Sequence, residues 1–420
     1  MSSPAPPSSS SLQPTAAGAR SLWPMLLALT AAFGMSQAFR TVTTIIAAPL
    51  EADFHIGAQA LGVFAGAYHF SFGVMQMFVG IGIDLYGVRR TVLAAFPLAI
   101  LGSVLTALAH SFPLLVLGQA LIGLGCAPTF LASTVFIARH LPPARFAVVS
   151  GQVLSLGGIG MLLTGTPLAW LIEASSWRGG FWVLAACAMA AWLAIWALVR
   201  EPAPLHAADS APQRESLREA FGKFGALLLL RHTLGIVLLA AVGYASFISL
   251  RGLWLGPMLM QRHGFSLVQS GNVALVMSLV SLFSPPLFGR LDPGPARRRA
   301  WIVGYTLVMA LLFAAPALLH LAWLDVASPL VIGLLSGYMV LQYADVRSAY
   351  PAALTGRAMA LFTMAMFLGV AFMQWFTGFI ASVAIAHAME PYAAVLGAIA
   401  ALLALGALAF LLLPGPTTQR

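Results

Sequence analysis

The sequence predicts an all-α polytopic membrane protein, with 12 transmembrane helices arranged as two pseudo-symmetric six-helix bundles. Of the 420 residues, 60% are hydrophobic and 8% are charged, whereas a soluble domain has about 25% charged residues. Apolar stretches longer than about 18 residues recur along the whole chain, as transmembrane helices do. Sequence features also recur at a fixed interval between the two halves. These observations exclude a soluble enzyme.

Twelve apolar spans follow one another, separated by short polar turns or by turns that contain Gly and Pro. A helix needs about 20 apolar residues to cross the bilayer. The first six spans are expected at 22–48, 58–83, 90–110, 112–138, 146–171 and 178–199. The second six are expected at 229–259, 267–289, 300–319, 329–350, 357–382 and 391–413. The expected bundles therefore occupy residues 21–200 and 228–413.

Polar segments flank and separate the bundles. Residues 1–20 are rich in Ser, Pro and Ala and lack the basic start of a signal peptide, so they are expected to form a disordered cytoplasmic tail. Residues 201–227 predict a cytoplasmic linker that ends in an amphipathic helix on the membrane surface. Residues 414–420 are expected to form a second cytoplasmic tail.

The cationic residues predict the orientation of the chain. With the N-terminus inside, 17 of the 21 Lys and Arg residues lie in cytoplasmic loops and tails. This bias obeys the positive-inside rule and places both termini in the cytoplasm, in an inner membrane of bacterial type. Because topology accounts for the net charge of +9, the lipid bilayer is the expected partner and nucleic acid is not.

An internal repeat relates the two halves. The loop after the second span contains an acid followed five and six positions later by two arginines, and the loop after the eighth span repeats this pattern 208 residues on. The residues are Asp84, Arg89 and Arg90 in the first loop, and Asp292, Arg297 and Arg298 in the second. The same offset maps Pro49 onto Pro257. The pattern indicates a parallel duplication.

The first loop resembles the signature of the major facilitator superfamily, which has a glycine, an acid four residues on, a second glycine and a basic pair. The resemblance covers residues 22–413 and implies a central cavity with alternating access by rocking of the bundles. An acid at a helix end can cap a neighbouring helix and pair with arginine. We therefore expect both acid–arginine loops to act as conformational latches, in a protein that can function as a monomer.

Two arginines at membrane depth are the main candidates for contact with substrate, because intramembrane ionisable groups by default mark a transport pathway. Arg40 and Arg251 lie in the first and seventh spans, which line the cavity in this family. They are expected to face each other with no carboxylate nearby, so that an anionic substrate supplies the counter-charge. The alternative is that each guanidinium reaches the outer interface or bonds to backbone carbonyls.

Other polar residues are expected to line the same cavity. His69 is the natural proton carrier, since the pKa of histidine is near 6.5. Gln119 stands where proton-exchanging relatives often carry Arg, so that role is not transferred to it. For each of these residues, hydrogen bonding between helices is the competing explanation. The remaining candidates are Tyr68, Tyr244, Asn272 and Gln374.

The predicted function is secondary transport of a small solute. The sequence favours an organic anion as the solute, and His69 adds proton symport as a weaker prediction. One alternative is proton-coupled efflux of amphipathic drugs, although the first half lacks a buried acid in any span. A second is uptake of copper or another metal through soft Met and His ligands. The candidates for that site are Met359, Met366, Met373, Met258, Met260 and His263. Nucleophile–base constellations, phosphate-binding loops and zinc-site spacings do not occur in the sequence, so neither an enzyme nor a cofactor is expected.

Overall fold

The computed structural model describes residues 22–200, 227, 230–350 and 352–413. Within these ranges all regular elements are helices, and 11 of them are long and apolar enough to cross a membrane. The arm of α4 (Ala58–Ala107) that precedes Gly87 is a further helical segment, at the place of the second expected span. The all-α membrane fold predicted from the sequence is confirmed. The predicted tails and nearly all of the predicted linker lie outside the described residues.

The N-terminal half contains one long kinked helix and several helices that form pairs. Its elements are α2 (Leu22–Thr41), α3 (Thr43–Phe54), α4, α5 (Phe112–Cys126), α6 (Pro128–His140), α7 (Pro143–Leu163), α8 (Thr166–Ala174) and α9 (Trp177–Leu198). The expected spans at 22–48, 112–138 and 146–171 are thus each divided in two. Pro128 is the first residue of α6 and Pro167 is the second residue of α8, in the first helical turn, where the missing N–H of proline is tolerated.

The C-terminal half repeats this arrangement with local changes in helix winding. Its elements are α11 (Arg231–Ser249), the π-helical turn η1 (Leu250–Trp254), α12 (Leu255–His263), α13 (Leu267–Arg290), α14 (Pro295–Leu319), α15 (Ala322–Leu335), the 3₁₀ turn η2 (Ser336–Tyr338), α16 (Met339–Ala349), α17 (Ala352–Ala386) and α18 (Pro391–Leu412). The seventh span is therefore continuous but contains a π turn, which often occurs at functional sites.

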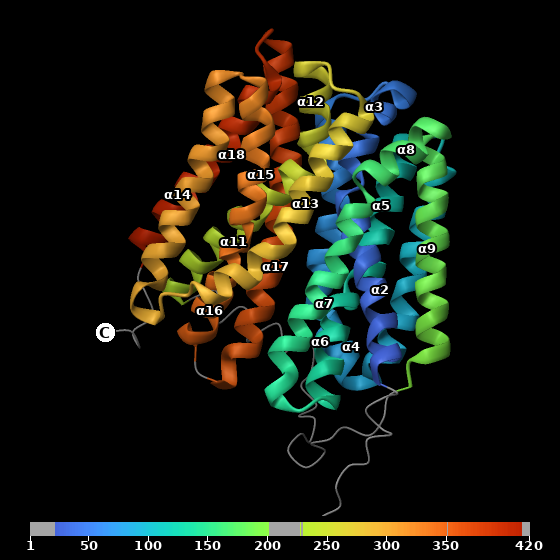
Figure 1. Ribbon diagram of the computed structural model, residues 1–420, viewed down its shortest axis with the longest axis vertical. Helices are drawn as coiled ribbons and strands as arrows, with labels where there is room; N and C mark the ends of the chain where they lie inside the picture. Colours follow the sequence, from blue (N-terminus) through green and yellow to red (C-terminus); the bar gives the residue numbers. More distant parts are fainter. Residues whose placement is uncertain (1–21, 201–226, 228–229, 351, 414–420) are drawn as a thin grey trace, which may run out of the picture.

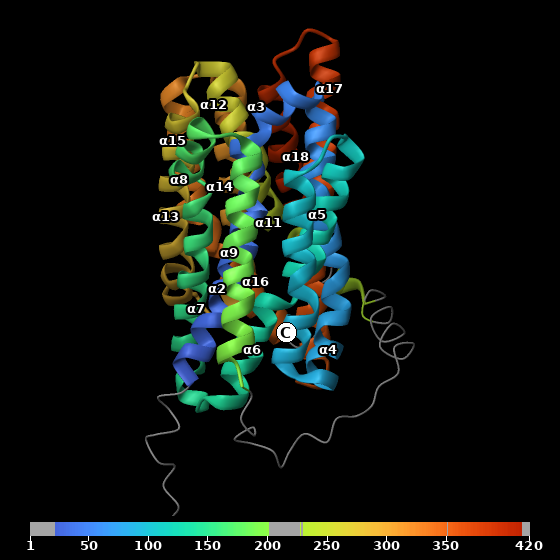
Figure 2. The same ribbon diagram turned by 90° about the vertical axis from the view of Figure 1, so that its right-hand side faces the viewer.

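The two halves lie side by side with their helices roughly upright (Figures 1 and 2). In Figure 1 the end that carries α3, α8 and α12 is at the top. Backbones of the two halves meet at this end, where a Cβ atom on Gly256 would lie 2.0 Å from the carbonyl oxygen of Thr44. The backbone N–H of Gly256 also donates to Oγ1 of Thr44 at 2.9 Å. Only glycine permits so close an approach.

Side-chain hydrogen bonds reinforce this contact between the halves. Thr166 donates to Oδ1 of Asn272 at 2.6 Å, and Gln261 donates to Glu51 at 3.3 Å. Along the same interface α4 packs against α17, and a Cβ atom on Gly62 would lie 2.3 Å from the carbonyl oxygen of Gln374. The structure is therefore closed at the end that bears α3 and α12.

The two repeat loops share a backbone conformation. Gly87 has φ 82° and ψ 169°, and Gly294 has φ 81° and ψ 169°. Both values of φ lie in the region that favours glycine. These glycines are 207 residues apart, one fewer than the offset that aligns the acids and the arginines, because the second loop has one residue fewer between its acid and its glycine. The duplication is thus visible in the backbone as well as in the sequence.

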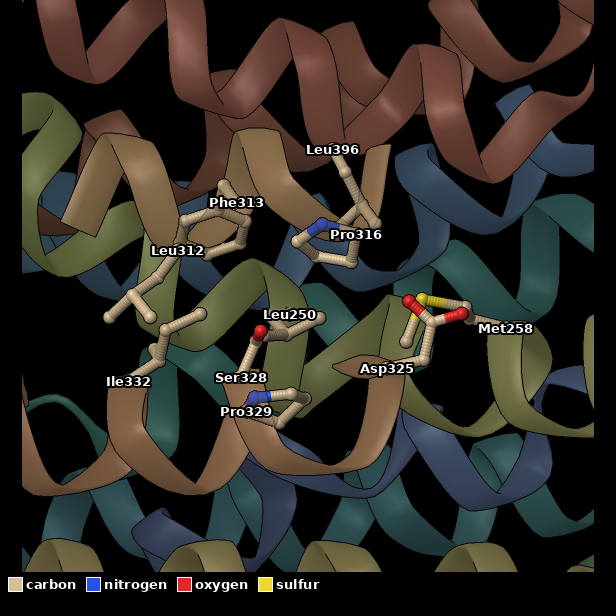
Figure 3. Close-up of a pocket in the computed structure, with 10 residues that line it drawn as sticks. All are labelled: Leu250, Met258, Leu312, Phe313, Pro316, Asp325, Ser328, Pro329, Ile332 and Leu396. Atoms are coloured by element: carbon tan, nitrogen blue, oxygen red, sulfur yellow. The ribbon is translucent and has the colours of Figure 1, made fainter. Parts of the chain in front are cut away.

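A buried ionic cluster fixes the closed end of the C-terminal half. Asp325 is fully buried and accepts hydrogen bonds from Arg262 at 2.9 Å and from Nε2 of His263 at 2.6 Å. Arg262 also binds Glu390, whose carboxylate accepts from the backbone N–H of Tyr392 in the first turn of α18. Figure 3 shows Asp325 at the edge of a cavity that is otherwise lined by apolar side chains and Ser328. At about 10 Å³, the cavity has room for about one water molecule.

We expect Gly160→Ala to destabilise the protein by about 1–3 kcal/mol, the usual cost of overpacking. The new Cβ would lie 1.8 Å from the carbonyl oxygen of Gly34 on α2. Gly151→Ala, on the same helix α7, is the matched control, because no atom lies within 4 Å of that position. Thermal denaturation of the purified variants tests this. Equal melting temperatures would show that the α2–α7 contact is not close-packed.

Candidate functional site

Arg40 is enclosed by side chains of three other helices. It lies at the end of α2 and its side chain is buried. One of its terminal nitrogens donates to the hydroxyl of Tyr244 on α11 at 2.6 Å. The guanidinium lies 5.3 Å from the ring centre of Phe72 on α4 and 4.7 Å from that of Phe367 on α17. These cation–π contacts partly replace the lost hydration, but Nε of Arg40 has no hydrogen-bond partner.

Arg251 is fully buried in the π turn η1. Its Nε donates to Oγ of Ser278 on α13 at 2.7 Å, and one terminal nitrogen donates to the carbonyl oxygen of Met161 on α7 at 2.8 Å. The other terminal nitrogen has no partner. Neither Arg40 nor Arg251 has a carboxylate within 4.0 Å among the described residues.

The break between α7 and α8 explains why the carbonyl of Met161 is available. In a continuous helix this oxygen would accept from the N–H four residues on, at Gly165. Instead, Gly165 donates to Leu162. Since the last carbonyls of a helix lack backbone partners within the helix, Arg251 can bind the carbonyl of Met161, which also accepts from the hydroxyl of Thr164 at 3.1 Å. The sequence alternative, in which an arginine bonds to a backbone carbonyl, therefore describes one of the contacts of Arg251.

The two guanidinium groups point to opposite sides of the interface. Arg40 contacts α4, α11 and α17, whereas Arg251 contacts α7 and α13. Their backbones are nevertheless adjacent, since a Cβ atom on Gly252 would lie 3.1 Å from the carbonyl oxygen of Arg40. In this conformation the arginines therefore do not share one site. Each one makes a hydrogen bond to the opposite half of the molecule.

His69, Tyr68 and Gln374 lie around Arg40. The Nδ1 atom of His69 lies 3.2 Å from the carbonyl oxygen of Ala65, and its Nε2 atom is buried without a partner. The imidazole stacks on Phe367 at 6.4 Å between ring centres, so His69 and Arg40 contact the same aromatic ring. Tyr68 donates to the carbonyl oxygen of Ser36. Both amide atoms of the fully buried Gln374 lack partners.

The other candidates fall in different places. Tyr244 is half-buried and binds Arg40. Gln119 is buried, and its amide nitrogen has no hydrogen-bond partner. Asn272 is exposed and binds Thr166 near the closed end, so it connects the halves rather than joining the group around Arg40.

Four contact residues were absent from the sequence-based set, namely Phe72, Phe367, Ser278 and the backbone of Met161. Apolar and small residues of these types occur throughout the chain, so no sequence signal separates them from ordinary packing residues. Spacing offers one weak clue for Phe72, which lies three residues after His69 and so on a similar face of the helix.

The second acid–arginine loop forms an ion pair, but with one specific arginine. Both oxygens of Asp292 accept hydrogen bonds from Arg298, at 3.0 and 2.7 Å. Arg298 also reaches the carbonyl oxygen of Ala344 on α16 at 3.4 Å. Arg297 is exposed. The hydrogen bonds from Arg298 hold the pKa of Asp292 below its ordinary value. The ion pair therefore stabilises the folded protein when Asp292 is ionised.

The first loop differs in its contacts. Arg89 donates to the carbonyl oxygen of Trp196 on α9 at 2.9 Å, and Arg90 is exposed. The side chain of Asp84 lies outside the described part of the structure, so a latch at Asp84 stays a prediction. When the two loops are aligned on their glycines, Thr91 takes the place of Arg298, and its hydroxyl donates to the carbonyl oxygen of Gly87 at 2.7 Å.

The methionines of α17 take part in packing. Met366 and Met373 are buried in the apolar core, and the sulfur of Met366 accepts from the hydroxyl of Tyr343 at 3.5 Å. Among the described residues, no group of three His, Cys, Asp or Glu side chains is placed to hold a metal ion.

A separate groove of about 360 Å³ lies outside the α4–α17 contact and is lined by apolar side chains such as Phe70, Phe372 and Trp375.

Comparison with known proteins identifies relatives of one kind. A family model described as Major Facilitator Superfamily matches residues 25–374. The chain is 23% identical over 279 residues to the uncharacterized transporter YybO of Bacillus subtilis, covering 64% of this chain and 62% of that one. It is also 23% identical over 189 residues to the hexuronate transporter of Bacillus subtilis, covering 45% of this chain and 44% of the relative.

A further relative is the probable sulfoacetate transporter SauU of Cupriavidus necator, 23% identical over 164 residues that cover 39% of this chain and 38% of that one. The chain thus spans less than two thirds of the length of each of these relatives. Among solved structures, a D-xylose–proton symporter matches with a TM-score of 0.72 and 14% identity, over 95% of this chain and 99% of that one. At this identity the likeness concerns the fold alone.

We expect Arg298→Gln to destabilise the protein at pH 7 by about 1 kcal/mol, in the range of a partly exposed ion pair, and Arg297→Gln to have no effect. Because the folded-state pKa of Asp292 is lowered, the stabilisation is present above the unfolded pKa, near 3.9, and is lost as the pH falls through the folded pKa. Melting temperatures measured across this pH range test it. A difference between wild type and Arg298→Gln that stayed constant at low pH would contradict it.

Proposed function

Because the chain belongs to the major facilitator superfamily, whose members are membrane transporters, we propose that it moves a small organic anion across a bacterial inner membrane by alternating access. Its termini face the cytoplasm in this proposal, so the closed end that bears α3 and α12 is the outer end. One observation carries the proposal: two buried arginines lie at the interface of the halves, and each has a nitrogen with no partner.

The physical argument rests on the cost of buried charge. A guanidinium that is removed from water without a counter-ion is unfavourable by several kcal/mol. Aromatic rings, hydroxyls and one carbonyl partly offset this cost here, but they supply no negative charge. A carboxylate or sulfonate would supply it, together with the paired acceptors that a guanidinium prefers.

The names of two relatives support an anionic substrate. Hexuronate and sulfoacetate are both anions, and the proteins named for them match parts of this chain. Because these two relatives are named for anions, we favour an anion over an amphipathic cation or a copper ion as the substrate. The methionines of α17 also have a sufficient role in packing.

Arg40 is the first contact for the anion in this proposal. It lies beside the unpartnered groups of His69 and Gln374, which can donate to or accept from other parts of the substrate. Arg251 completes a two-arginine clamp in another conformation, after it leaves Met161 and Ser278. This exchange of partners links binding of the anion to movement of α7 and α13 relative to η1.

We expect Arg40→Gln to reduce anion uptake by roughly ten- to a hundredfold, since a hydrogen bond to a charged group contributes about 1.5–3 kcal/mol. Arg251→Gln is expected to reduce it to a similar extent. Uptake of glucuronate and of sulfoacetate into proteoliposomes, with folding checked by thermal denaturation, measures this. The exposed Arg290→Gln is the matched control. Wild-type uptake by folded Arg40→Gln and Arg251→Gln variants would refute the anion proposal.

A second prediction concerns the coupling ion. If His69 carries the proton, His69→Gln should abolish accumulation driven by a pH gradient and retain anion exchange across the membrane, because exchange needs no net proton movement and the glutamine amide still offers a hydrogen bond to the substrate. The two modes are measured in the same proteoliposomes with and without the gradient. Accumulation that persists in His69→Gln would remove His69 from the coupling path while leaving the anion site untouched.

A further inference from the structure

The guanidinium of Arg40 is enclosed by two aromatic rings and hydrogen-bonds to one hydroxyl, whose place another acceptor can take. The rings of Phe72 and Phe367 lie near its guanidinium, and the side chain is 6% exposed. Its single side-chain hydrogen bond in the described structure goes to Tyr244 at 2.6 Å. The aromatic rings cannot accept a conventional in-plane hydrogen bond. The hydroxyl of Tyr68 also interacts with the guanidinium, but the oxygen of Tyr244 accepts the short hydrogen bond that joins Arg40 to the opposite half.

The hydroxyl of Tyr244 is placed so that an arriving acceptor can displace it from Arg40. It is half-buried, its hydroxyl has no other hydrogen bond among the described residues, and its ring makes an edge contact with Phe367 at 5.7 Å between ring centres. By contrast, the hydroxyls of Tyr68 and Tyr338 belong to fully buried side chains bonded within their own halves. Tyr244 also lies on the opposite half from Arg40, so its bond joins α2 to α11 across the interface.

On the basis of the proposed anion transport, we propose that the hydroxyl of Tyr244 is an internal placeholder for the substrate. It occupies the place on Arg40 that an oxygen of the anion takes, and the arriving anion displaces it. A carboxylate is a stronger acceptor for a guanidinium than a neutral phenol, so the exchange favours the anion. The substrate thereby breaks a link between α2 and α11 in the act of binding.

The placeholder has two consequences for transport. In the empty protein it gives Arg40 a partner, where an unpaired guanidinium in an apolar enclosure would be destabilising. It also lowers the apparent affinity for the anion, because the binding-competent form is only the fraction in which Tyr244 has moved away. Tyr244 is therefore a positioning residue that sets affinity and ties the two halves together, rather than a group that binds substrate.

The test compares Tyr244→Phe with wild type, Arg40→Gln and the control Tyr343→Phe. Tyr343 is also half-buried, and its hydroxyl contacts Met366 instead of Arg40. Binding of glucuronate and of sulfoacetate is measured by calorimetry on purified protein. We expect Tyr244→Phe to bind the anion roughly tenfold more tightly, the effect of removing a competing hydrogen bond to a charged group. Tyr343→Phe should match wild type, and Arg40→Gln should bind weakly.

A second readout follows the tyrosine itself. With 3-fluorotyrosine incorporated, the ¹⁹F signal that is missing in Tyr244→Phe identifies Tyr244, and it should shift when anion is added to wild type. In Arg40→Gln the same addition should leave it unchanged.

The outcomes separate the two proposals. Affinity that is unchanged or lower in Tyr244→Phe, with Arg40→Gln still impaired, overturns the placeholder and leaves anion transport intact. Arg40→Gln binding as well as wild type, or no anion binding to wild type, overturns the anion proposal and the placeholder with it.

Discussion

Buried positive charge at the interface between the two halves is the constraint around which the rest of the structure is arranged. Arg40 and Arg251 are almost fully removed from solvent, and neither has a carboxylate partner among the described residues. The surrounding structure compensates with aromatic faces for Arg40 and with a hydroxyl and a carbonyl for Arg251. Each arginine makes one hydrogen bond to the opposite half, so the same contacts that tolerate the charge also join the halves.

Two irregular helix segments make the contacts of Arg251 possible. The break between α7 and α8 frees the carbonyl of Met161 for Arg251, and the π turn η1 holds Arg251 toward α13. Glycines bring the backbones of the two halves into contact nearby, at Gly252 beside Arg40 and at Gly256 beside Thr44. Because these contacts are made by backbone atoms and short hydrogen bonds, they can form and separate as rigid surfaces, which is the kind of motion that alternating access between paired bundles requires.

The charged clusters outside the interface have a different role. Asp325, Arg262 and Glu390 are bonded to one another within the C-terminal half, and Asp292 with Arg298 connects the loop before α14 to α16. These groups satisfy their charges internally and hold one half together. Arg40 and Arg251 differ from these groups, because they lie between the halves and have no carboxylate partner among the described residues.

The sequence by itself determined the membrane fold, the duplication and the family, because hydropathy and a loop signature are properties of neighbouring residues along the chain. It also selected Arg40, His69 and Tyr244 by residue type, since polar groups are rare at membrane depth. Only the tertiary structure decided which of them meet. The directions of Arg40 and Arg251 depend on a freed carbonyl, a π turn and two phenylalanines distant in sequence. Spacing along a regular helix cannot predict partners that irregular helices supply.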